Sequence, residues 1–503
     1  MSQLDLLPRP KSVVRADGSF TLTADVAISG PAEWAAIVRR LLTPGTGLDL
    51  LPAESAAFTL IKDAELAAEA YQLSVTPDGI TITAADDRGV NWAVQTLRQL
   101  LPAQAFGPAP VASEIAVPAV EIVDAPRFAW RGVMLDTGRH FMPYADVIAF
   151  LDLLAMHKYN TFHLHLTEDQ GWRLESKKYP QLTEHASSRA ETKNPYWESG
   201  DGTPHGGYYT QDQLRAIVAY AAQRGITVVP EIEFPGHVRA MLAAFPQLGN
   251  HPDRQAGAAT TWGIFPEVLN MTDASLEFAF DIWEEVLEIF PSTYIHVGGD
   301  ECPRDEWRES EATKKLAAER GRQLVGWDEI NDEGILDGAI TMAWRDEKYG
   351  VIAAEAGGQV VMSPVSKTYF DYYPGAGDDE PYSIGNLITT ERAYSLEPTD
   401  GIPAELHDQI LGTQCQVWTE YMPSARRVQY MLYPRGCAHS EVAWSDPEGR
   451  SWQEFSGRLP GHLARLDALG VNYRPEAGPL PWQQGGTGAW QRPEPHRNTT
   501  PRG

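Results

Sequence analysis

The 503-residue sequence is short of several features, and each absence excludes a class of protein. Its only cysteines, Cys302, Cys415 and Cys437, are too few and too widely spaced to suggest a disulfide framework. It has 41 basic against 68 acidic residues, and the net charge of -27 disfavours nucleic acid and anionic membranes as partners. Because no stretch approaches about 18 uninterrupted apolar residues, a membrane-spanning helix is not expected either.

Two short signals are also missing. The N-terminus, MSQLDLLPRPKSVV, has no apolar run behind a basic start, so we expect no signal peptide and a cytoplasmic location; a secreted form trimmed of its signal would read the same. The sequence has no GxxxxGK[ST] phosphate loop and no GxGxxG opening a helix after a strand, which disfavours nucleotide chemistry. The composition is otherwise that of an ordinary globular protein, with 43% hydrophobic residues.

The first part of the chain, residues 1–125, is predicted to form a small α+β domain. Runs 19–29 and 70–87 have strand-like alternation, the second around a PDG turn. Residues 88–101 carry apolar side chains at helical spacing. The segment 108–126, rich in Pro, Ala and Val, is predicted to be the connection to the next domain.

Residues 126–475 are predicted to form a catalytic α/β domain in which strands and helices alternate. The eight strand-like segments are 131–139, 160–168, 226–233, 292–301, 322–330, 339–345, 359–364 and 410–420. Amphipathic stretches lie between them, such as 144–158 and 212–224, the second capped by Thr210. Such alternation implies parallel strands, and eight units predict a (β/α)8 TIM barrel. Residues 476–503, rich in Gly, Pro and Gln, are predicted to be an irregular C-terminal tail.

Acids and aromatic residues gather where the predicted barrel strands end, which is where such barrels hold their chemistry. These strand-end residues are Asp136 to His140, Glu168 to Gln170, Glu231 and Glu233, Asp300 and Glu301, Trp327 to Glu329, Trp344 and Arg345, Tyr369 and Asp371, and Trp418 and Glu420. One such acid alone is more often a solvated loop residue or helix cap, and one tryptophan more often core. Together they favour a carbohydrate site, because indoles stack on sugar faces and glycosidic cleavage needs a protonated carboxyl.

The segment HVGGDE (296–301) poses a geometric problem for such a site. Successive side chains of a strand point to opposite faces, so the adjacent acids Asp300 and Glu301 would not share one pocket. Gly298 and Gly299 can relax the strand just before this pair. We therefore expect both carboxylates to reach the pocket, from different sides.

Several motifs in register resemble those of one family. They are RGVMLDTGRHF (131–141), HLHLTEDQGWR (163–173), GGYYTQDQ (206–213), VVPEIEFPGH (228–237), HVGGDE (296–301), VGWDE (325–329) and VWTE (417–420). Together they resemble the β-N-acetylhexosaminidases of glycoside hydrolase family 20, from about residue 127 to residue 446. The first 125 residues resemble the small α+β domain of that family.

The resemblance implies substrate-assisted catalysis, for which this family is a known exception to the two-carboxylate scheme. By resemblance, Glu301 is the general acid that protonates the glycosidic oxygen and then, as base, activates water. Asp300 accepts a hydrogen bond from the 2-acetamido N–H and stabilises the charge that this group acquires. The acetamido oxygen itself attacks the anomeric carbon, so the family implies net retention.

The resemblance also assigns residues that grip the sugar. Arg139 is expected to bind the 3- and 4-hydroxyls, and Glu420 and Asp371 to complete the grip on the 4- and 6-hydroxyl side. Tyr369 is expected to donate to the acetamido oxygen. The indoles expected to wall the acetamido pocket and floor the sugar ring are Trp327, Trp344 and Trp418.

Two further residues are expected to lie behind Glu301 and set its proton affinity, namely His237 and Glu168. Some relatives have Asp at position 168, and some place a further tryptophan near Ile384. No cofactor and no metal ion are expected. The expected partner is a small carbohydrate with a terminal β-linked N-acetylhexosamine.

Two alternatives stay open at this point. His163, His165, His237 and Asp300 are ligand types that a metal-dependent barrel hydrolase of the amidohydrolase kind would use. However, the HxH pair precedes an acidic EDQ segment instead of lying on the first barrel strand, and no bridging lysine is evident. The other alternative is a non-catalytic sugar-binding protein on the same fold.

Overall fold

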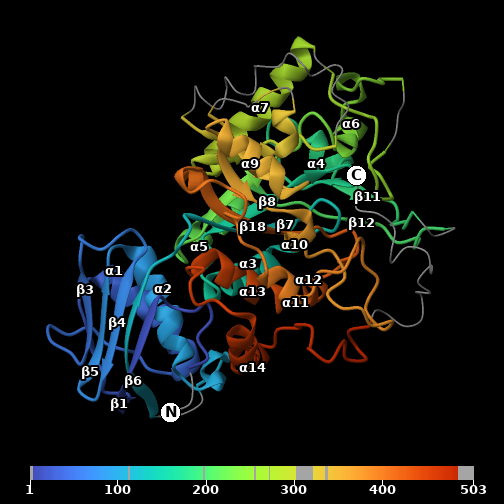
Figure 1. Ribbon diagram of the computed structural model, residues 1–503. Coiled ribbons are helices and arrows are strands. Elements are labelled where there is room, and N and C mark those ends of the chain that lie inside the picture. Colours follow the sequence, from blue (N-terminus) through green and yellow to red (C-terminus); the bar gives the residue numbers. More distant parts are fainter. Residues whose placement is uncertain are drawn as a thin grey trace.

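The computed structural model describes residues 4–110, 114–195, 199–253, 257–270, 272–301, 321–332, 334 and 338–484. Figure 1 shows an N-terminal sheet with its helices beside a larger barrel unit. The helix α14 (Trp452–Ala468) follows the barrel and packs against the 3-10 helix η1 (Ala103–Phe106) of the N-terminal unit. Cys302 lies outside the described residues, and Cys415 and Cys437 are buried free thiols.

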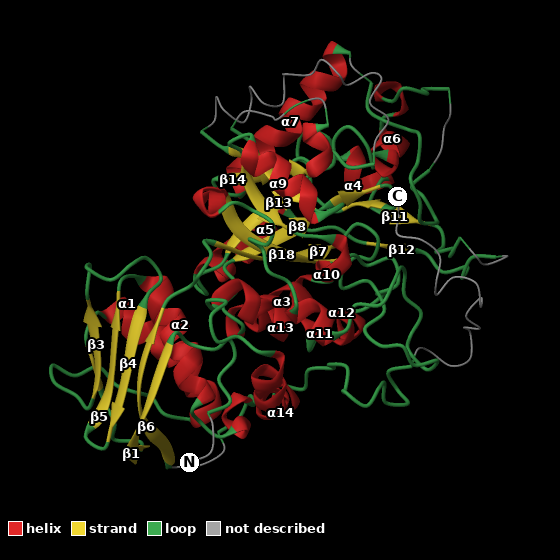
Figure 2. Ribbon diagram, viewed as in Figure 1, coloured by secondary structure: helices red, strands yellow, loops and turns green. Residues whose placement is uncertain are grey.

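The N-terminal unit is a six-stranded sheet in the order β1-β6-β4-β5-β3-β2. Its strands are β1 (Ser12–Leu22), β2 (Ile28–Ser29), β3 (Phe58–Lys62), β4 (Tyr71–Thr76), β5 (Gly79–Ala84) and β6 (Ile115–Asp124). Helices α1 (Ala32–Thr46) and α2 (Asp87–Gln99) cover one face of the sheet (Figure 2) and bury apolar residues against it. The predicted hairpin at 70–87 and the predicted helix at 88–101 are both confirmed, as β4–β5 and α2.

The prediction of a simple connection at 108–126 is wrong, because β6 lies within it and pairs with both β1 and β4. Pro118, which cannot donate to a sheet ladder, made this segment look like a linker. In the fold it pairs with Ser19, where the register of β1 shifts. The irregular pairing at that point accommodates the residue that hid the strand.

The second unit is a closed barrel of eight parallel strands, as predicted. In barrel order they are β7 (Trp130–Asp136), β8 (Thr161–His165), β13 (Thr227–Glu231), β14 (Tyr294–His296), β15 (Gln323–Trp327), β16 (Ile340–Ala343), β17 (Gln359–Met362) and β18 (Ile410–Val417). Each falls within one of the eight predicted segments or extends it by a single residue. All eight end earlier than predicted, so the polar residues at the ends of the predicted segments lie beyond these strands.

Helices surround the barrel strands. They are α3 (Tyr144–Met156), α5 (Gln211–Ala222), α7 (Asp273–Ile289), α9 (Glu347–Glu355), α12 (Ala425–Leu432) and α13 (Arg435–Trp444). Shorter elements are α4 (Gln181–His185), α6 (Arg239–Ala244), α10 (Val365–Thr368), α11 (Thr390–Tyr394), β9 (Thr167–Glu168), β10 (Gly171–Trp172), β11 (Ser188–Arg189), β12 (His205–Gly206), η2 (Pro246–Leu248), η3 (Asp328–Asn331) and η4 (Ala404–Gln409). The predicted cap Thr210 forms a capping box with Gln213 at the start of α5.

A buried ion pair joins the two units. Lys158 Nζ lies 2.8 Å from Asp124 Oδ2, and both side chains are fully buried. Asp124, the last residue of β6, also accepts hydrogen bonds from Tyr71 Oη and Trp444 Nε1. A buried charge of this kind needs its full set of partners, which fixes the N-terminal sheet against the base of the barrel.

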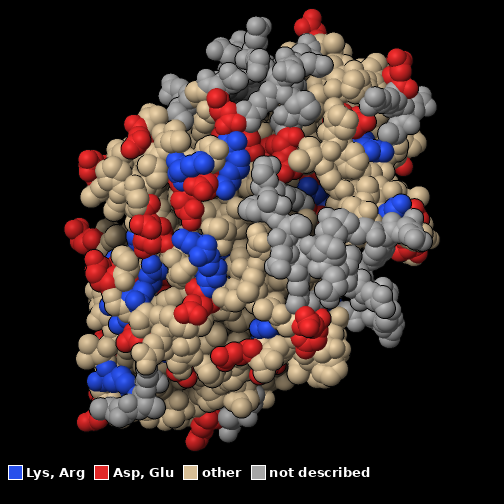
Figure 3. All heavy atoms as spheres, turned by 45° about the vertical axis from the view of Figure 1, so that its right-hand side comes forward, with Lys and Arg blue, Asp and Glu red and all other residues tan. Residues whose placement is uncertain are grey.

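The surface is mixed in charge. On the face drawn in Figure 3, basic side chains lie among the more numerous acidic ones. Within the described part of the chain, no helix is both long enough and apolar enough to cross a bilayer. Residues 476–484, the described part of the predicted tail, form turns and coil.

Candidate active site

All of the predicted site residues lie at the C-terminal ends of the barrel strands. Arg139 follows β7, Glu168 ends β9, and His237 follows β13. The others are Asp300 and Glu301 after β14, Trp327 at the end of β15, Trp344 after β16, Tyr369 and Asp371 after β17 and α10, and Trp418 and Glu420 after β18. Apart from Glu301, whose side chain is 14% exposed, every one of these residues is buried.

The backbone before the acidic pair leaves the strand conformation. The strand β14 ends at His296, and Gly298, Gly299 and Glu301 have φ values of 68°, 93° and 52°. Only glycine adopts such values readily, so the two glycines turn the chain here and Glu301 itself is held in the left-handed region. The alternation of a strand therefore no longer applies to Asp300 and Glu301.

The two carboxylates meet at one histidine. Asp300 Oδ2 and Glu301 Oε2 lie 3.7 and 3.8 Å from His237 Nε2. Burial raises the pKa of Asp300, the His237 cation opposes the rise and the nearby Glu301 adds to it, so that the pKa is raised to about 6. Both acids therefore reach the same pocket, and Asp300 is poised to change charge just below neutral pH.

His237 is held from behind by two more acids. Its Nδ1 lies 2.8 Å from Glu168 Oε1 and 3.0 Å from Asp169 Oδ2, and the contact with Asp169 has hydrogen-bond geometry. Burial lowers the pKa of His237, but Glu168, Asp169 and Asp300 outweigh it and raise that pKa well above its usual range. The ring is therefore an imidazolium, which donates a hydrogen bond from Nδ1 and turns its Nε2 toward Asp300 and Glu301.

Arg139 is fixed by the ends of two neighbouring strands. The Oδ1 atom of Asp136 accepts from the Arg139 backbone N–H, while its Oδ2 accepts from Thr419 after β18. The guanidinium lies 3.1 Å from Glu168 Oε2, and its Cζ lies 4.8 Å from the centre of the Trp418 ring. It is thus held between a carboxylate and an indole face, close to the charge of Glu420.

The aromatic residues form a contiguous wall. Trp418 packs on Trp327 and Tyr369, with centroids 5.7 and 6.4 Å apart, and Tyr369 stacks on Trp344 at 5.8 Å. Burial raises the pKa of Tyr369 well above its usual range, and the negative charges of Asp300 and Asp371 add to this. The Tyr369 hydroxyl therefore keeps its proton and can act as a donor.

Each of two indoles is anchored by a buried glutamate. Trp327 Nε1 donates to Glu231 Oε1 at 3.0 Å, and Trp344 Nε1 donates to Glu329 Oε2 at 2.8 Å. Burial, followed by the charges of Asp300 and Asp328, raises the pKa of Glu329 to about 8. These anchors fix the ring planes of the wall before any ligand arrives.

Three acids of the site were not singled out among the predicted site residues: Asp169, Glu233 and Glu329. Each stands at a predicted strand end, within EDQ, PEIE or WDE, and that position could have identified it as a site residue. Glu233 is 1% exposed, and burial together with Asp300 and Glu231 raises its pKa well above its usual range. Sequence position alone does not say which strand-end acids meet, because that depends on how neighbouring loops turn.

In the described structure, buried acids surround His165 of the predicted HxH pair. His165 donates to Glu231 Oε2 at 2.5 Å and lies 3.2 Å from Glu168 Oε2. Burial lowers the pKa of His165, but Glu231 and Glu168 raise it to about 10. Without a bound ion, both of its nitrogens therefore carry protons, each facing a carboxylate.

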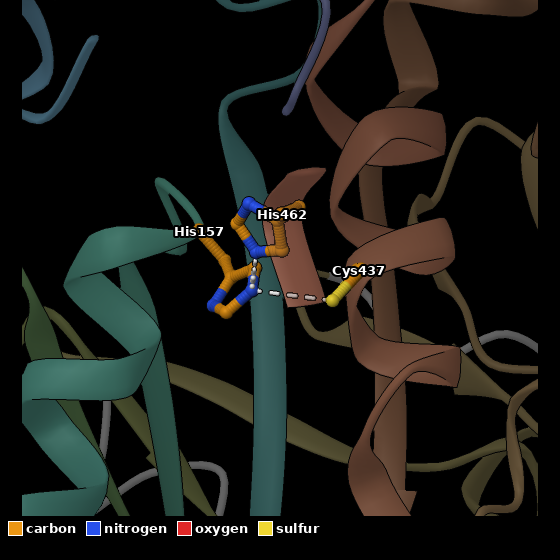
Figure 4. A group of neighbouring side chains, drawn as sticks. All are labelled: His157, Cys437 and His462. Atoms are coloured by element: carbon orange, nitrogen blue, oxygen red, sulfur yellow. Dashed lines mark hydrogen bonds between the residues drawn. The ribbon is translucent and has the colours of Figure 1, made fainter. Parts of the chain in front are cut away.

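A third histidine cluster lies at the base of the barrel, between α3, α13 and α14 (Figure 4). His157 Nδ1 donates to Leu153 O, so its Nε2 is an acceptor for His462 Nε2 at 2.9 Å and for the Cys437 thiol at 3.3 Å. Arg465 donates to His462 Nδ1, which leaves the proton of that ring on Nε2. Burial lowers the pKa of His157 to about 4 and raises that of the Cys437 thiol. The group is a complete neutral hydrogen-bond network that fastens α14 to the barrel.

Comparisons with known proteins agree with this architecture. The sequence model of "Glycosyl hydrolase family 20, catalytic domain" matches residues 128–323 and 311–447, and that of "Glycosyl hydrolase family 20, domain 2" matches residues 3–125. The chain is 37% identical to a beta-hexosaminidase of Porphyromonas gingivalis, over 96% of this chain and 66% of that protein. It is 32% identical to a beta-N-acetylhexosaminidase of Cellulomonas fimi, over 94% of this chain and 96% of that protein.

Solved structures show the same fold. A GH20 beta-N-acetylhexosaminidase from Streptomyces coelicolor superimposes with a TM-score of 0.87 at 28% identity, covering 95% of this chain and 98% of that one. A GH20 exo beta-N-acetylglucosaminidase from Vibrio harveyi, solved in complex with N-acetylglucosamine, gives a TM-score of 0.84 at 30% identity, with 94% and 78% covered. With both domain models matched in order and the site residues at the strand ends, the chain belongs to glycosyl hydrolase family 20.

Proposed function

We propose that this family 20 glycosidase is a retaining exo-β-N-acetylhexosaminidase that removes terminal non-reducing GlcNAc or GalNAc from β-glycosides. The activity named for its relatives supports this, as does the Vibrio harveyi structure in complex with N-acetylglucosamine. The substrate is then a small carbohydrate that carries a terminal β-linked N-acetylhexosamine. The buried wall of indoles around Tyr369 is of a kind that suits an acetamido methyl group and a sugar face.

One observation carries the mechanism: Asp300 and Glu301 approach the same nitrogen of His237. An ordinary retaining enzyme places its acid and its nucleophile about 5 Å apart on opposite sides of the scissile bond. Consecutive residues that approach one histidine nitrogen are poorly placed to act on opposite sides of the scissile bond. The nucleophile is therefore supplied by the substrate, whose own acetamido oxygen has a high effective concentration at the anomeric carbon.

The steps follow from the charges of the site. Glu301 gives its proton to the glycosidic oxygen while the acetamido oxygen bonds to the anomeric carbon and the bond to the leaving group breaks. Asp300, ionised above about pH 6, accepts a hydrogen bond from the acetamido N–H and balances the positive charge of the oxazolinium ring. Glu301 then takes a proton from water, which attacks the same carbon and opens the ring with net retention.

The remaining residues hold the sugar and the acid. Glu420 is close enough to Arg139, and Asp371 close enough to Tyr369, for their charges to act on these side chains, so Arg139, Glu420 and Asp371 can all bond to the hydroxyl rim of the sugar. Tyr369 keeps its proton and donates to the acetamido oxygen. The His237 cation, held by Glu168 and Asp169, faces both Asp300 and Glu301 and favours the ionised form of Asp300.

Hydrolysis of a chromogenic N-acetyl-β-glucosaminide tests the proposal, with the matching β-glucoside as the control that lacks the acetamido group. The glucoside should not be turned over, and a thiazoline mimic of the cyclic intermediate should inhibit. Glu301→Gln should lower the hydrolysis rate about 10²- to 10⁴-fold for substrates with a poor leaving group. The loss should be much smaller for activated aryl glycosides, because only a poor leaving group needs a proton. Asp300→Asn should lower the hydrolysis rate about 10²- to 10³-fold for both kinds of substrate, which is the usual effect of removing one contact that stabilises charge in the transition state.

The same assay separates the alternatives. Turnover of the β-glucoside at the same rate as the N-acetyl-β-glucosaminide would refute the substrate-assisted mechanism. Calorimetric binding of GlcNAc without turnover of any aryl glycoside would point to a sugar-binding protein. Loss of activity in a strong chelator would point to a metal-dependent hydrolase.

A further inference from the structure

Glu231, the last residue of β13, lies at a junction beneath the pocket. It is fully buried, and four nitrogen atoms from three neighbouring strands surround its carboxylate. Its Oε2 lies 2.9 Å from His163 Nε2 and 2.5 Å from His165 Nδ1, both on β8. Its Oε1 lies 2.7 Å from His296 Nδ1 on β14 and 3.0 Å from Trp327 Nε1 on β15.

The carboxylate of Glu231 carries a negative charge, which the neighbouring histidines stabilise. Burial alone would raise the pKa of Glu231, but His296, His165 and His163 lower it well below its usual range. His163 is itself neutral near pH 7, because burial lowers its pKa to about 4. His165, whose pKa is raised to about 10, forms a charged pair with Glu231, and a buried charge that loses its partner is strongly unfavourable.

Contacts lead from this pair to the residues that face the sugar. The other nitrogen of His165 lies 3.2 Å from Glu168 Oε2. Glu168 in turn contacts Arg139 at 3.1 Å and His237 at 2.8 Å. The His165 ring also packs edge-on against Trp418, with centroids 5.1 Å apart.

A second arm leads directly to the wall of the pocket. The hydrogen bond from Trp327 Nε1 to Glu231 fixes the plane of this indole, which packs on Trp418. One carboxylate thus orients Trp327 directly and, through His165 and Glu168, both Arg139 and His237. Supporting contacts of this kind set the precision of a site, because misplacement of a reacting group by about 1 Å can cost 10²-fold in rate.

We propose that Glu231 is a positioning residue of the active site. Its carboxylate holds Trp327, His165 and, through His165, Glu168 in the orientation that sugar binding requires. This role rests on the proposed function, since it deepens the same site. Glu231 touches neither substrate nor the reacting carboxylates in this arrangement. It acts through the side chains that do.

A conservative variant and a matched control test the proposal. Glu231→Gln keeps the shape but removes the charge. Glu441→Gln does the same to another fully buried carboxylate, which receives four donors from Arg9, Tyr394 and Arg458 far from the pocket. Both should lower the melting temperature. Only Glu231→Gln should lower kcat/KM, by about 10- to 100-fold as for other residues that orient ligands, with a rise in KM.

The pH profile gives a readout that loss of stability would not move. The titratable groups around His165 are Glu231, Glu168, Asp136, Glu233 and His163. In Glu231→Gln the largest attraction that keeps the proton on His165 is gone. Its pKa falls, so activity of this variant should decline as pH rises from 6 to 9, whereas Glu441→Gln should keep the wild-type profile.

His165→Gln provides a second test should Glu231→Gln fail to fold. It keeps amide donors but no charge, and should also lower kcat/KM while leaving the Trp327 arm intact. Calorimetric affinity for the thiazoline mimic should weaken in both variants, which tests positioning even if no glycoside is turned over. Wild-type values of kcat/KM, affinity and pH profile in these two variants would overturn the role of Glu231, whereas an inactive wild-type protein would instead refute the proposed function.

Discussion

The turn before the acidic pair offers the sharpest test of how the site is built. Replacement of Gly298 by alanine adds a single methyl group two residues before Asp300. Gly298 has a φ of 68°, and an added Cβ would overlap the carboxyl of Glu233. Glu233 is 1% exposed, so its carboxyl would have to shift among other buried groups.

Two terms set the magnitude of the effect. A left-handed conformation costs a non-glycine residue about 1–2 kcal/mol. Overpacking of a buried site adds about 1–3 kcal/mol. Gly298→Ala should therefore lose about 2–5 kcal/mol of unfolding free energy. Displacement of Asp300 and Glu301 by about 1 Å should lower kcat/KM by about 10²-fold.

Gly357→Ala is the matched control, because Gly357 has a φ of 84° and a Cβ there would meet no atom within 4 Å. This variant should lose only the cost of the left-handed conformation, about 1–2 kcal/mol of unfolding free energy, and its kcat/KM should not change. Urea unfolding and hydrolysis of a chromogenic N-acetyl-β-glucosaminide measure both quantities. Adding Glu233→Ala to Gly298→Ala removes the overlapping atoms and should recover part of the lost stability. A Gly298→Ala variant that is no less stable than Gly357→Ala and retains wild-type activity would contradict the predicted clash with Glu233.

Three further predictions concern other parts of the chain. Because the pKa of Asp300 is raised to about 6 and its ionised form does the work, kcat/KM should rise with pH through about 6, and an acid limb near 4 would contradict this. Thr210→Ala removes one half of the capping box on α5 and should lose about 1 kcal/mol in urea unfolding, with Gln213→Ala losing less; equal stability to wild type would show that the cap is idle. Lys158→Met leaves Asp124 as a buried charge without its cation and should lose about 3–5 kcal/mol, whereas a loss below 1 kcal/mol would mean that Tyr71 and Trp444 suffice to hold it.

The barrel could be predicted because its signals are local. Each strand is a short apolar run, each helix has its own periodicity and cap, and the alternation of the two dictates parallel pairing. The strand β6 was missed for the converse reason. Pro118 contradicts a strand locally, and only its pairing with the irregular stretch of β1 makes that position acceptable. Non-local pairing outweighed local preference there.

The site was predictable as a set but not as an arrangement. Strand-end position placed Arg139, His237 and Trp418 at one end of the barrel, since all parallel strands finish there. Which atoms meet depended on loop turns of a few residues. The sequence could not indicate that His165 pairs with Glu231 inside the barrel, because the spacing HxH does not say which partner each ring meets.

By itself, the sequence determined the two-domain order, the barrel and the family, because these follow from periodicity and from motifs of six to eleven residues in register. It also determined that Asp300 and Glu301 adjoin two glycines. Only the tertiary structure decided that the glycines adopt positive φ and bring both acids to His237, and that burial moves the pKa of Asp300 to about 6. Charge and proximity in a pocket arise from residues far apart in the chain, so no local pattern can encode them.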